Sequence, residues 1–315
     1  MVTYTIEPDQ QTLHGCFSRE LPPVLTIDPG DTVRYRTLDA GWGLEPQLAQ
    51  CIPRRKFVPR IEEWNDGHAL CGPVAIRGAQ PGMTLEVQIN AIRPGTFGLT
   101  IAGYGGEDKE RNKRLHIEDE TLHTWTLDAD TMTARDQHGL ILSLRPFMGV
   151  MGMPPDEPGT HSTGPPRFCG GNIDCKELVA GSSLYLPISV SGALFSVGDG
   201  HGLQGDGEVC GVAIECPMEL VDLTFYLHES PQLATPRANT PAGWLTLGFH
   251  EDLDEATMVA LDAMLDLMCE QYSLQRQDAL ALASLVVDMR ITQIVNGVQG
   301  VHALLPHGVI RWRNG

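Results

Sequence analysis

Up to about residue 250, apolar and polar residues alternate in short runs, and Gly and Pro separate one run from the next. The clearest runs are residues 32–38, 84–92 and 219–227, where β-branched and apolar side chains partly alternate with polar ones. Period-two alternation of this kind predicts strands. The 34 Gly and 22 Pro of the chain also leave little room for long helices in this part. We therefore expect a body built of short strands.

The pattern changes after residue 250, where residues 254–272 show the 3.6-residue period of an amphipathic helix. Its apolar stripe consists of Met258, Leu261, Met264, Leu265 and Met268. A second helix, rich in Ala and Leu and more buried, is expected at residues 275–287, and a strand at 289–295. The expected fold class is therefore α+β and predominantly β, a β-rich body of short strands with a helical hairpin near the C-terminus.

Three tight turns that each lead into a strand resemble one another, at residues 29–33, 81–85 and 180–184. Repeated β-modules produce such a pattern, and so does chance, because turns of this kind are common before strands. We expect a single catalytic unit over residues 1–315. Within it, a division into an N-terminal β-rich part, 1–160, and a C-terminal part, 161–315, with the main polar loops and the helical hairpin, stays open.

Charge and composition restrict the classes of partner. Acidic residues outnumber basic ones 40 to 22, a net charge of −18 that repels nucleic acid and anionic lipid. The same field disfavours anionic substrates unless a local basic patch exists. No apolar run approaches the roughly 20 residues that cross a bilayer, and the first residues do not resemble a signal peptide. We expect a cytoplasmic protein whose eight cysteines are reduced and mostly buried.

Two Gly-rich segments, residues 160–174 and 195–208, carry unusually many polar side chains beside apolar strands. The second places five of them within ten positions: Asp199, His201, Gln204, Asp206 and Glu208. The interleaved glycines let the backbone bend so that these side chains converge. Carboxylates and imidazole bind a divalent cation such as zinc, and a remaining Glu could act as a base. A polar loop that only turns a corner is the alternative, whereas an EF-hand is disfavoured because strands flank the loop.

A third polar cluster, residues 65–73, contains His68, which could be a metal ligand, a proton shuttle or a hydrogen-bonded loop histidine. The sequence contains no G-x-S-x-G motif, P-loop or dinucleotide fingerprint. A nucleophile could still be Cys169, Cys175 or a serine, because catalytic groups need only be close in space. Water activated by a metal is the favoured chemistry. A protein in which the metal only ties loops together is a second alternative.

Three motifs resemble those of a known family. Residues 72–82 read GPVAIRGAQPG, residues 170–174 read GGNID, and residues 198–208 read GDGHGLQGDGE, the most specific of the three. Together they resemble the acetamidase/formamidase family, and in length the shorter, acetamidase-like branch. The resemblance implies a hydrolase that cleaves the C–N bond of a small linear amide to a carboxylate and ammonia.

The resemblance and the local density of polar groups together suggest roles for these residues. The expected metal ligands are Asp174, Asp199 and His201. The expected catalytic residues are Glu208 as general base, with Asp206 and His68. The residues expected to orient the substrate are Asn172 and Gln204. The metal is expected to be zinc, with calcium as the second choice. Exposed strand edges in a β-rich body further predict a homo-oligomer, a dimer in the simplest case.

Overall fold

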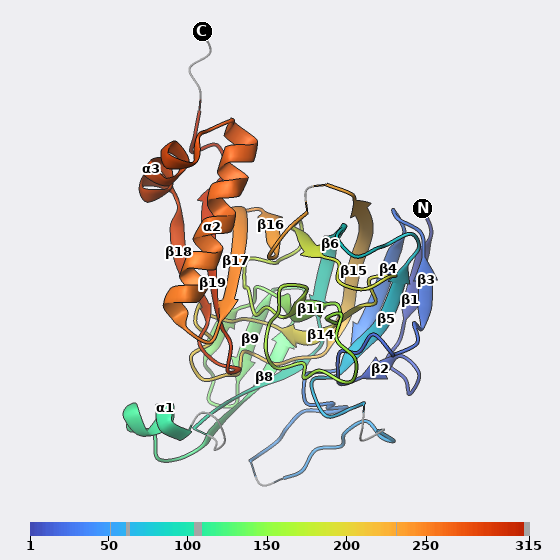
Figure 1. Ribbon diagram of the computed structural model, residues 1–315. Coiled ribbons are helices and arrows are strands. Elements are labelled where there is room, and N and C mark those ends of the chain that lie inside the picture. Colours follow the sequence, from blue (N-terminus) through green and yellow to red (C-terminus); the bar gives the residue numbers. More distant parts are fainter. Residues whose placement is uncertain (51, 61–63, 104–108, 231, 312–315) are drawn as a thin grey trace.

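Strands dominate the computed structural model, which describes residues 1–50, 52–60, 64–103, 109–230 and 232–311. The chain is 40% strand and 12% helix, which confirms the predominantly β, α+β fold class. Within the described residues the strands form three sheets (Figure 1). No helix in these ranges is long and apolar enough to cross a membrane.

The largest sheet mixes strands from early and late parts of the chain. In spatial order its strands are β1 (Thr3–Ile6), β4 (Thr32–Thr37), β15 (Met218–His228), β6 (Thr84–Pro94), β13 (Ser183–Pro187), β16 (Arg237–Thr240), β17 (Gly243–His250), β19 (Gln299–Pro306) and β18 (Asp288–Gln293). The three strands that follow the similar turns, β4, β6 and β13, all lie in this sheet. Its neighbours pair in antiparallel fashion except β1 and β4, which are parallel.

A second sheet packs against the first and is buried on both faces. It consists of β12 (Gly170–Asn172), β11 (Phe147–Gly152), β14 (Phe195–His201), β5 (Leu70–Ile76) and β2 (Leu13–His14), with β3 (Leu25–Ile27) paired to β5. Every residue of β11, β12, β14 and β5 is buried. The first half of the polar segment 195–208 is therefore a central strand rather than a loop. Phe195 on β14 meets Phe225 on β15 edge to face, at a centroid distance of 5.1 Å.

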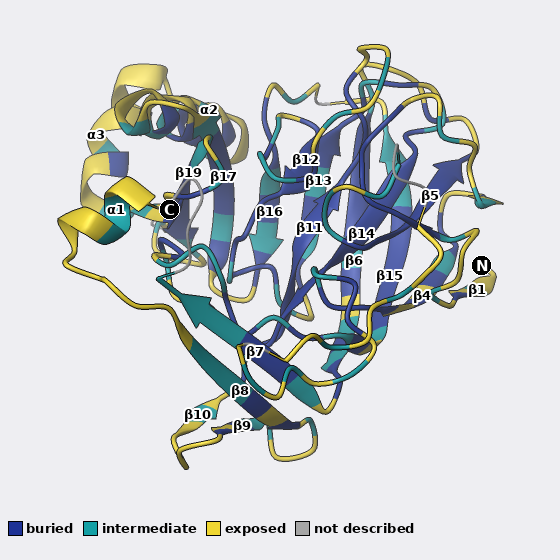
Figure 2. Cartoon of the chain, turned by 90° about the horizontal axis from the view of Figure 1, so that it is seen from below, coloured by how far each residue is buried: buried dark blue, intermediate teal, exposed yellow. Residues whose placement is uncertain are grey.

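The third sheet projects from the body with much of its surface exposed (Figure 2). Its strands are β10 (Ile141–Ser143), β9 (Thr133–Asp136), β8 (Thr121–Asp128) and β7 (Phe97–Ala102). The short exposed helix α1 (Lys109–Arg114) lies between β7 and β8 in the chain. Leu99 on β7 exchanges backbone hydrogen bonds with Glu215, so the base of this sheet is tied to a loop of the central body.

The predicted helical hairpin is present as α2 (Leu253–Tyr272) and α3 (Arg276–Val286). The Asp252 side chain caps α2 by accepting hydrogen bonds from two backbone N–H groups of the first turn. Met264 and Met268 are buried where α2 packs on β17 and β19, as the stripe predicts, but Met258 is 57% exposed. The expectation that the second helix is the more buried is wrong, because α3 packs mainly on α2 and buries only alanines.

The cysteine prediction holds for seven of the eight residues. They are all free thiols, and five of them are buried. Cys51 lies outside the described residues.

Candidate active site

Four carboxylates and one imidazole converge at one end of the second sheet. Asp199 and His201 are on β14, Asp174 follows β12, and Glu208 and Glu215 lie on the loop that leaves β14. Their ligand atoms form two groups that share His201. The first group consists of Asp174, Asp199 and His201, and the second of His201, Glu208 and Glu215. Within each group the ligand atoms lie within 4.8 Å of one another. The sheet therefore brings together residues that are 41 positions apart in the chain.

The orientation of the His201 ring is fixed by Gln204. Gln204 donates from Nε2 to the Asp174 carbonyl oxygen at 2.7 Å, so its Oε1 faces His201 Nδ1 at 2.8 Å. His201 Nδ1 therefore carries the proton that it donates to Gln204. His201 Nε2 then points at Asp199 Oδ1 and Glu215 Oε1, each at 3.3 Å. A hydrogen bond that fixes one ring nitrogen and directs the other is typical of metal-binding histidines.

The backbone at these acids is in an unfavourable conformation. Asp174, Asp199 and Glu208 have φ angles of 52°, 58° and 44°, in the left-handed region that L residues rarely adopt. Each such residue costs of order 1 kcal/mol and persists only where the surrounding structure imposes it. Strained residues of this kind are typical of functional sites, which agrees with the clustering of their side chains.

Gly149 on β11 leaves the space that the acids occupy. A Cβ at this position would come within 2.4 Å of Asp199 Oδ2 and 2.8 Å of both Asp174 Oδ1 and His201 Cε1. The Gly149 carbonyl oxygen also accepts hydrogen bonds from the backbone N–H groups of Ile173 and Asp174. The glycine therefore lets the two aspartates and the histidine approach one another across the strand.

Burial and mutual repulsion set the electrostatics of the cluster. Burial raises the pKa of Glu208 to about 8, with Glu215 and Asp199 adding to the effect and His201 opposing it. Burial, together with Glu208, also raises the pKa of Asp174 well above its ordinary value. Burial would raise the pKa of Asp199, but His201, His68 and Glu215 together hold it below its usual range. Burial would lower the pKa of His201, but Glu215 and Asp199 raise it well above its ordinary value.

The donor set fits a divalent cation. Asp174 Oδ1, Glu208 Oε2 and Glu215 Oε2 are buried and have no hydrogen-bond partner among the described residues. Buried carboxylate oxygens without a partner are costly, and a cation bound between them removes that cost. Nitrogen from one His and oxygens from acids form a donor set that zinc accepts.

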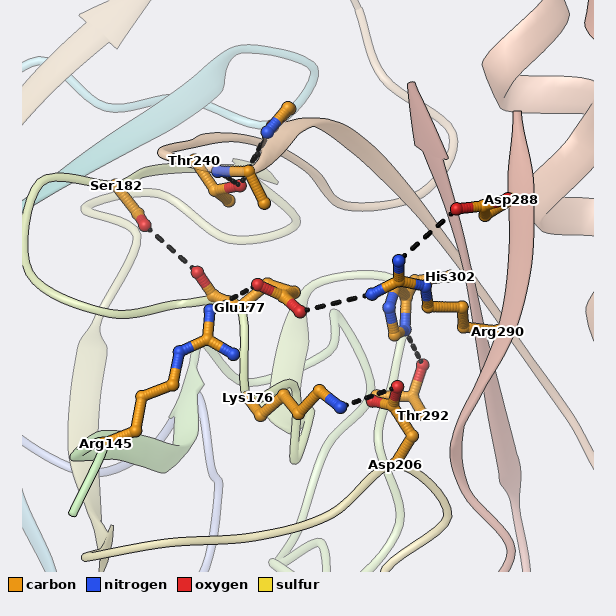
Figure 3. Close-up of polar contacts among 12 residues, drawn as sticks. Arg145, Lys176, Glu177, Ser182, Asp206, Thr240, Asp288, Arg290, Thr292 and His302 are labelled. Atoms are coloured by element: carbon orange, nitrogen blue, oxygen red, sulfur yellow. Dashed lines mark hydrogen bonds and ion pairs between the residues drawn. The ribbon is translucent and has the colours of Figure 1, made fainter. Parts of the chain in front are cut away.

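A second polar network supports the loops that carry Asp174 and Glu208 (Figure 3). Lys176 pairs with Asp206 at 2.8 Å. Nearby, Glu177 pairs with both Arg145 and Arg290, the latter from β18. The backbone of the same strand reaches the site loop, because Gly207 N–H donates to the Thr292 carbonyl at 3.0 Å. The C-terminal strands therefore hold the Glu208 loop in place.

A cavity of about 370 Å³ opens onto the cluster, a size typical of small-molecule sites. The cluster residues that line it are Asp199, His201, Glu208 and Glu215, together with His68 and Asn172. Asn172 Oδ1 is buried and has no described partner, while His68 Nδ1 bonds Thr163 Oγ1 at 2.8 Å. A larger cavity, about 650 Å³, lies against α2, and none of the clustered carboxylates lines it.

Three predicted site residues do not line the cavity. Asp206, expected to be catalytic, pairs with Lys176 in the supporting network instead. Gln204, expected to bind substrate, uses its amide to hold His201 and the Asp174 backbone. Asp174 itself is buried, does not line the cavity, and accepts a hydrogen bond from Asn296 Nδ2 at 3.2 Å.

Sequence reasoning missed two site residues, Glu215 and Asn296. Glu215 lies between the apolar Ile214 and Cys216, and an isolated acid inside an apolar run is a signal that could have identified it. Asn296 precedes Gly297, and an Asn-Gly pair between two strands is ordinarily interpreted as a hairpin turn. Nothing in that pattern indicates that the Asn side chain also reaches Asp174.

The fold and the cluster define a predominantly β protein with a buried carboxylate–histidine site beside a small cavity. Comparison with known proteins identifies its family. The model of the acetamidase/formamidase family matches residues 2–160 and 157–235, so the chain belongs to this family.

Individual relatives are distant in sequence and similar in structure. The chain is 27% identical to a formamidase of Methylophilus methylotrophus over 262 residues, which are 66% of this chain. It is 27% identical to an acetamidase of Mycolicibacterium smegmatis over 54% of this chain. The chain spans 62% and 61% of the length of these two relatives. The crystal structure of an acetamidase from Bacillus halodurans superposes with a TM-score of 0.82 at 26% identity, covering 96% of this chain and 97% of that one.

Proposed function

We propose that the protein hydrolyses small linear amides, R–CO–NH₂, to a carboxylate and ammonia. The observation that carries this proposal is the buried group of four carboxylates and His201 beside a cavity, in a chain of the acetamidase/formamidase family. Relatives named as a formamidase and an acetamidase support the same reaction class.

The residues that would hold a divalent cation are Asp174, Asp199 and His201, with Glu215 beside them. Such a cation supplies Lewis-acid chemistry, polarising an amide carbonyl and making water a stronger acid. Zinc is the proposed metal because imidazole nitrogen is among its preferred ligands, whereas calcium prefers oxygen alone. Calcium is the second choice because acids supply most of the ligands.

Glu208 is the proposed general base. Its carboxylate lines the cavity, and Oε2 has no partner in the described part of the chain. In this mechanism Glu208 takes a proton from the water that attacks the amide carbon, and then delivers it to the departing nitrogen. The C–O bond forms, the C–N bond breaks, and ammonia leaves with the transferred proton.

The remaining predicted residues receive narrower roles. Asn172 lines the cavity and its Oδ1 has no hydrogen-bond partner among the described residues, and we assign this oxygen to an N–H group of the substrate amide. His68 lines the same cavity and is held by Thr163, which suits a proton shuttle. Gln204 and Asp206 act as positioning residues, Gln204 through His201 and Asp206 through the loop that carries Glu208.

A cysteine nucleophile is disfavoured by the environment of both candidate thiols. Burial raises the pKa of Cys169 to about 11 and that of Cys175 to about 12. The reactive form of cysteine is the thiolate, which is scarce at neutral pH at such values. Neither residue lines the cavity.

The proposal is tested by measuring ammonia release from formamide, acetamide and larger amides, before and after chelation and with zinc added back. Activity that disappears on chelation and returns with zinc is the expected result. If chelation lowers the melting temperature and no amide is cleaved at any stage, the metal is only structural. Turnover that survives complete metal removal would contradict the metal-dependent mechanism.

A further inference from the structure

The cavity is larger than the smallest amides require. It encloses about 370 Å³. Acetamide has four non-hydrogen atoms, which fill about 100 Å³ if each takes roughly the volume of a water molecule. The carboxylates and His201 mark the inner, buried part of the cavity, whereas the exposed Lys56 marks the side that faces solvent. A substrate that fills the space therefore extends from the cluster toward Lys56.

The side that faces solvent has the opposite charge to the rest of the molecule. Residues 53–60 read PRRKFVPR, four cations without an acid in a chain of net charge −18. Arg54 is neutralised, because Asp39 binds it through two hydrogen bonds of 2.5 and 2.9 Å. Arg55 pairs with Glu45 at 3.6 Å and lies outside the cavity.

Lys56 has no such partner. It lines the cavity, and within the described ranges it forms no ion pair with a carboxylate. Partial burial, Arg54 and Arg60 lower the pKa of Lys56, and the Asp39 carboxylate opposes them only in part, so Lys56 lies near other positive charges. Arg60 itself lies over the Trp42 ring, with its guanidinium carbon 5.2 Å from the ring centre. An anion beside Lys56 would relieve this repulsion.

Part of the cavity wall is apolar. Leu99 and Ile101 of β7 and Val212 of the site loop line the cavity with aliphatic surface. Lys56 lines the cavity without a carboxylate partner among the described residues, so a substrate carboxylate is favoured at the Lys56 end. We propose, on the basis of the amidase function above, that the preferred substrate class is the monoamide of a short dicarboxylic acid. Its carboxamide lies at Glu208, its aliphatic linker along Leu99 and Val212, and its carboxylate at Lys56.

The test compares an anionic and a neutral amide of similar size. Succinamate and butyramide are given to the wild-type holoenzyme, and kcat/KM is measured by ammonia release for each. We expect kcat/KM for succinamate to exceed that for butyramide by at least about tenfold, because one hydrogen bond between charged groups contributes a factor of about this size. In Lys56→Met the ratio of kcat/KM for succinamate to kcat/KM for butyramide should fall about tenfold, because KM for succinamate rises. Arg55→Met is the matched control outside the cavity and should keep the wild-type ratio.

The outcomes separate this inference from the amidase proposal. If butyramide is hydrolysed but succinamate is not preferred, or if Lys56→Met keeps the wild-type ratio, the carboxylate site is wrong and the amidase proposal stands. If neither amide is hydrolysed, the amidase proposal fails. Calorimetric titration of succinamate into wild type and Lys56→Met then tests the carboxylate site separately from the chemistry. Binding that is absent from both proteins, or equally strong in both, overturns the site at Lys56.

Discussion

Among the described residues, one buried carboxylate oxygen of Glu208 and one of Asp174 have no hydrogen-bond partner, yet the two acids occupy different positions in the site. Glu208 lines the cavity, where substrate and water can reach it, whereas Asp174 does not line it and bonds to Asn296. Proximity within a cluster therefore does not make two acids equivalent. The one that faces the cavity is suited to proton transfer, and the enclosed one to holding a cation.

This difference predicts that two isosteric substitutions both lower activity but differ in their effect on metal content. Glu208→Gln should keep the metal content and the melting temperature but lower kcat by about 10²–10⁴-fold, the usual contribution of a general base. Asp174→Asn should lose metal as well as activity, because an amide oxygen carries no net charge. The check is to measure the metal content and the turnover number of both purified variants. Normal turnover by Glu208→Gln would remove its assignment as the base.

At the scale of elements, the site depends on strand β11 as much as on the acidic segments. Gly149 of β11 has no side chain, and the carboxylates of Asp174 and Asp199 occupy the space that a Cβ at this position would need. Gly149→Ala should displace those carboxylates, lower metal content and abolish most activity, at a stability cost of about 1–3 kcal/mol. Gly205→Ala is the control, because its Cβ would meet nothing within 4 Å. Far-UV circular dichroism and metal analysis compare the two, and a metal-loaded Gly149→Ala protein would contradict the expectation.

The elements also show what the sequence can and cannot predict. Strands β4, β6 and β15 and the helix α2 were predictable because their periodicity is local. The polar side chains of segment 195–208 favour a loop, because Asp199 and His201 give no sign that residues 195–201 form β14, at the centre of a sheet. The convergence of Asp174, His201 and Glu215 depends on strand pairing across distant segments, which no local pattern encodes. For the same reason, no local pattern indicates that Asp206 pairs with Lys176 and does not line the cavity.

At the scale of the whole molecule, a buried histidine links two strands of the second sheet, β2 and β14, that lie on either side of β5. His14 on β2 bonds Ser196 Oγ of β14 at 2.9 Å and the Cys16 carbonyl oxygen at 2.7 Å. Burial lowers the pKa of His14 to about 4, and the Cys16 carbonyl offsets this only in part. An unfolded histidine titrates near 6.5. The folded protein therefore keeps His14 neutral at a pH where the unfolded chain is already protonated.

This mismatch makes stability depend on pH with a definite sign. Between pH 6.5 and about 4 the unfolded state binds a proton at residue 14 and the folded state does not, so the free energy of unfolding falls as the pH falls. The full difference of about 2.5 pKa units corresponds to about 3 kcal/mol, and the contribution is constant above pH 6.5. Urea unfolding at intervals from pH 4.5 to 7.5 measures it. His14→Gln should reduce the slope below pH 6.5, whereas His116→Asn, at an exposed position, should keep it. Equal slopes in wild type and His14→Gln would mean that His14 is protonated in the folded protein, and that the contact between β2 and β14 tolerates the charge.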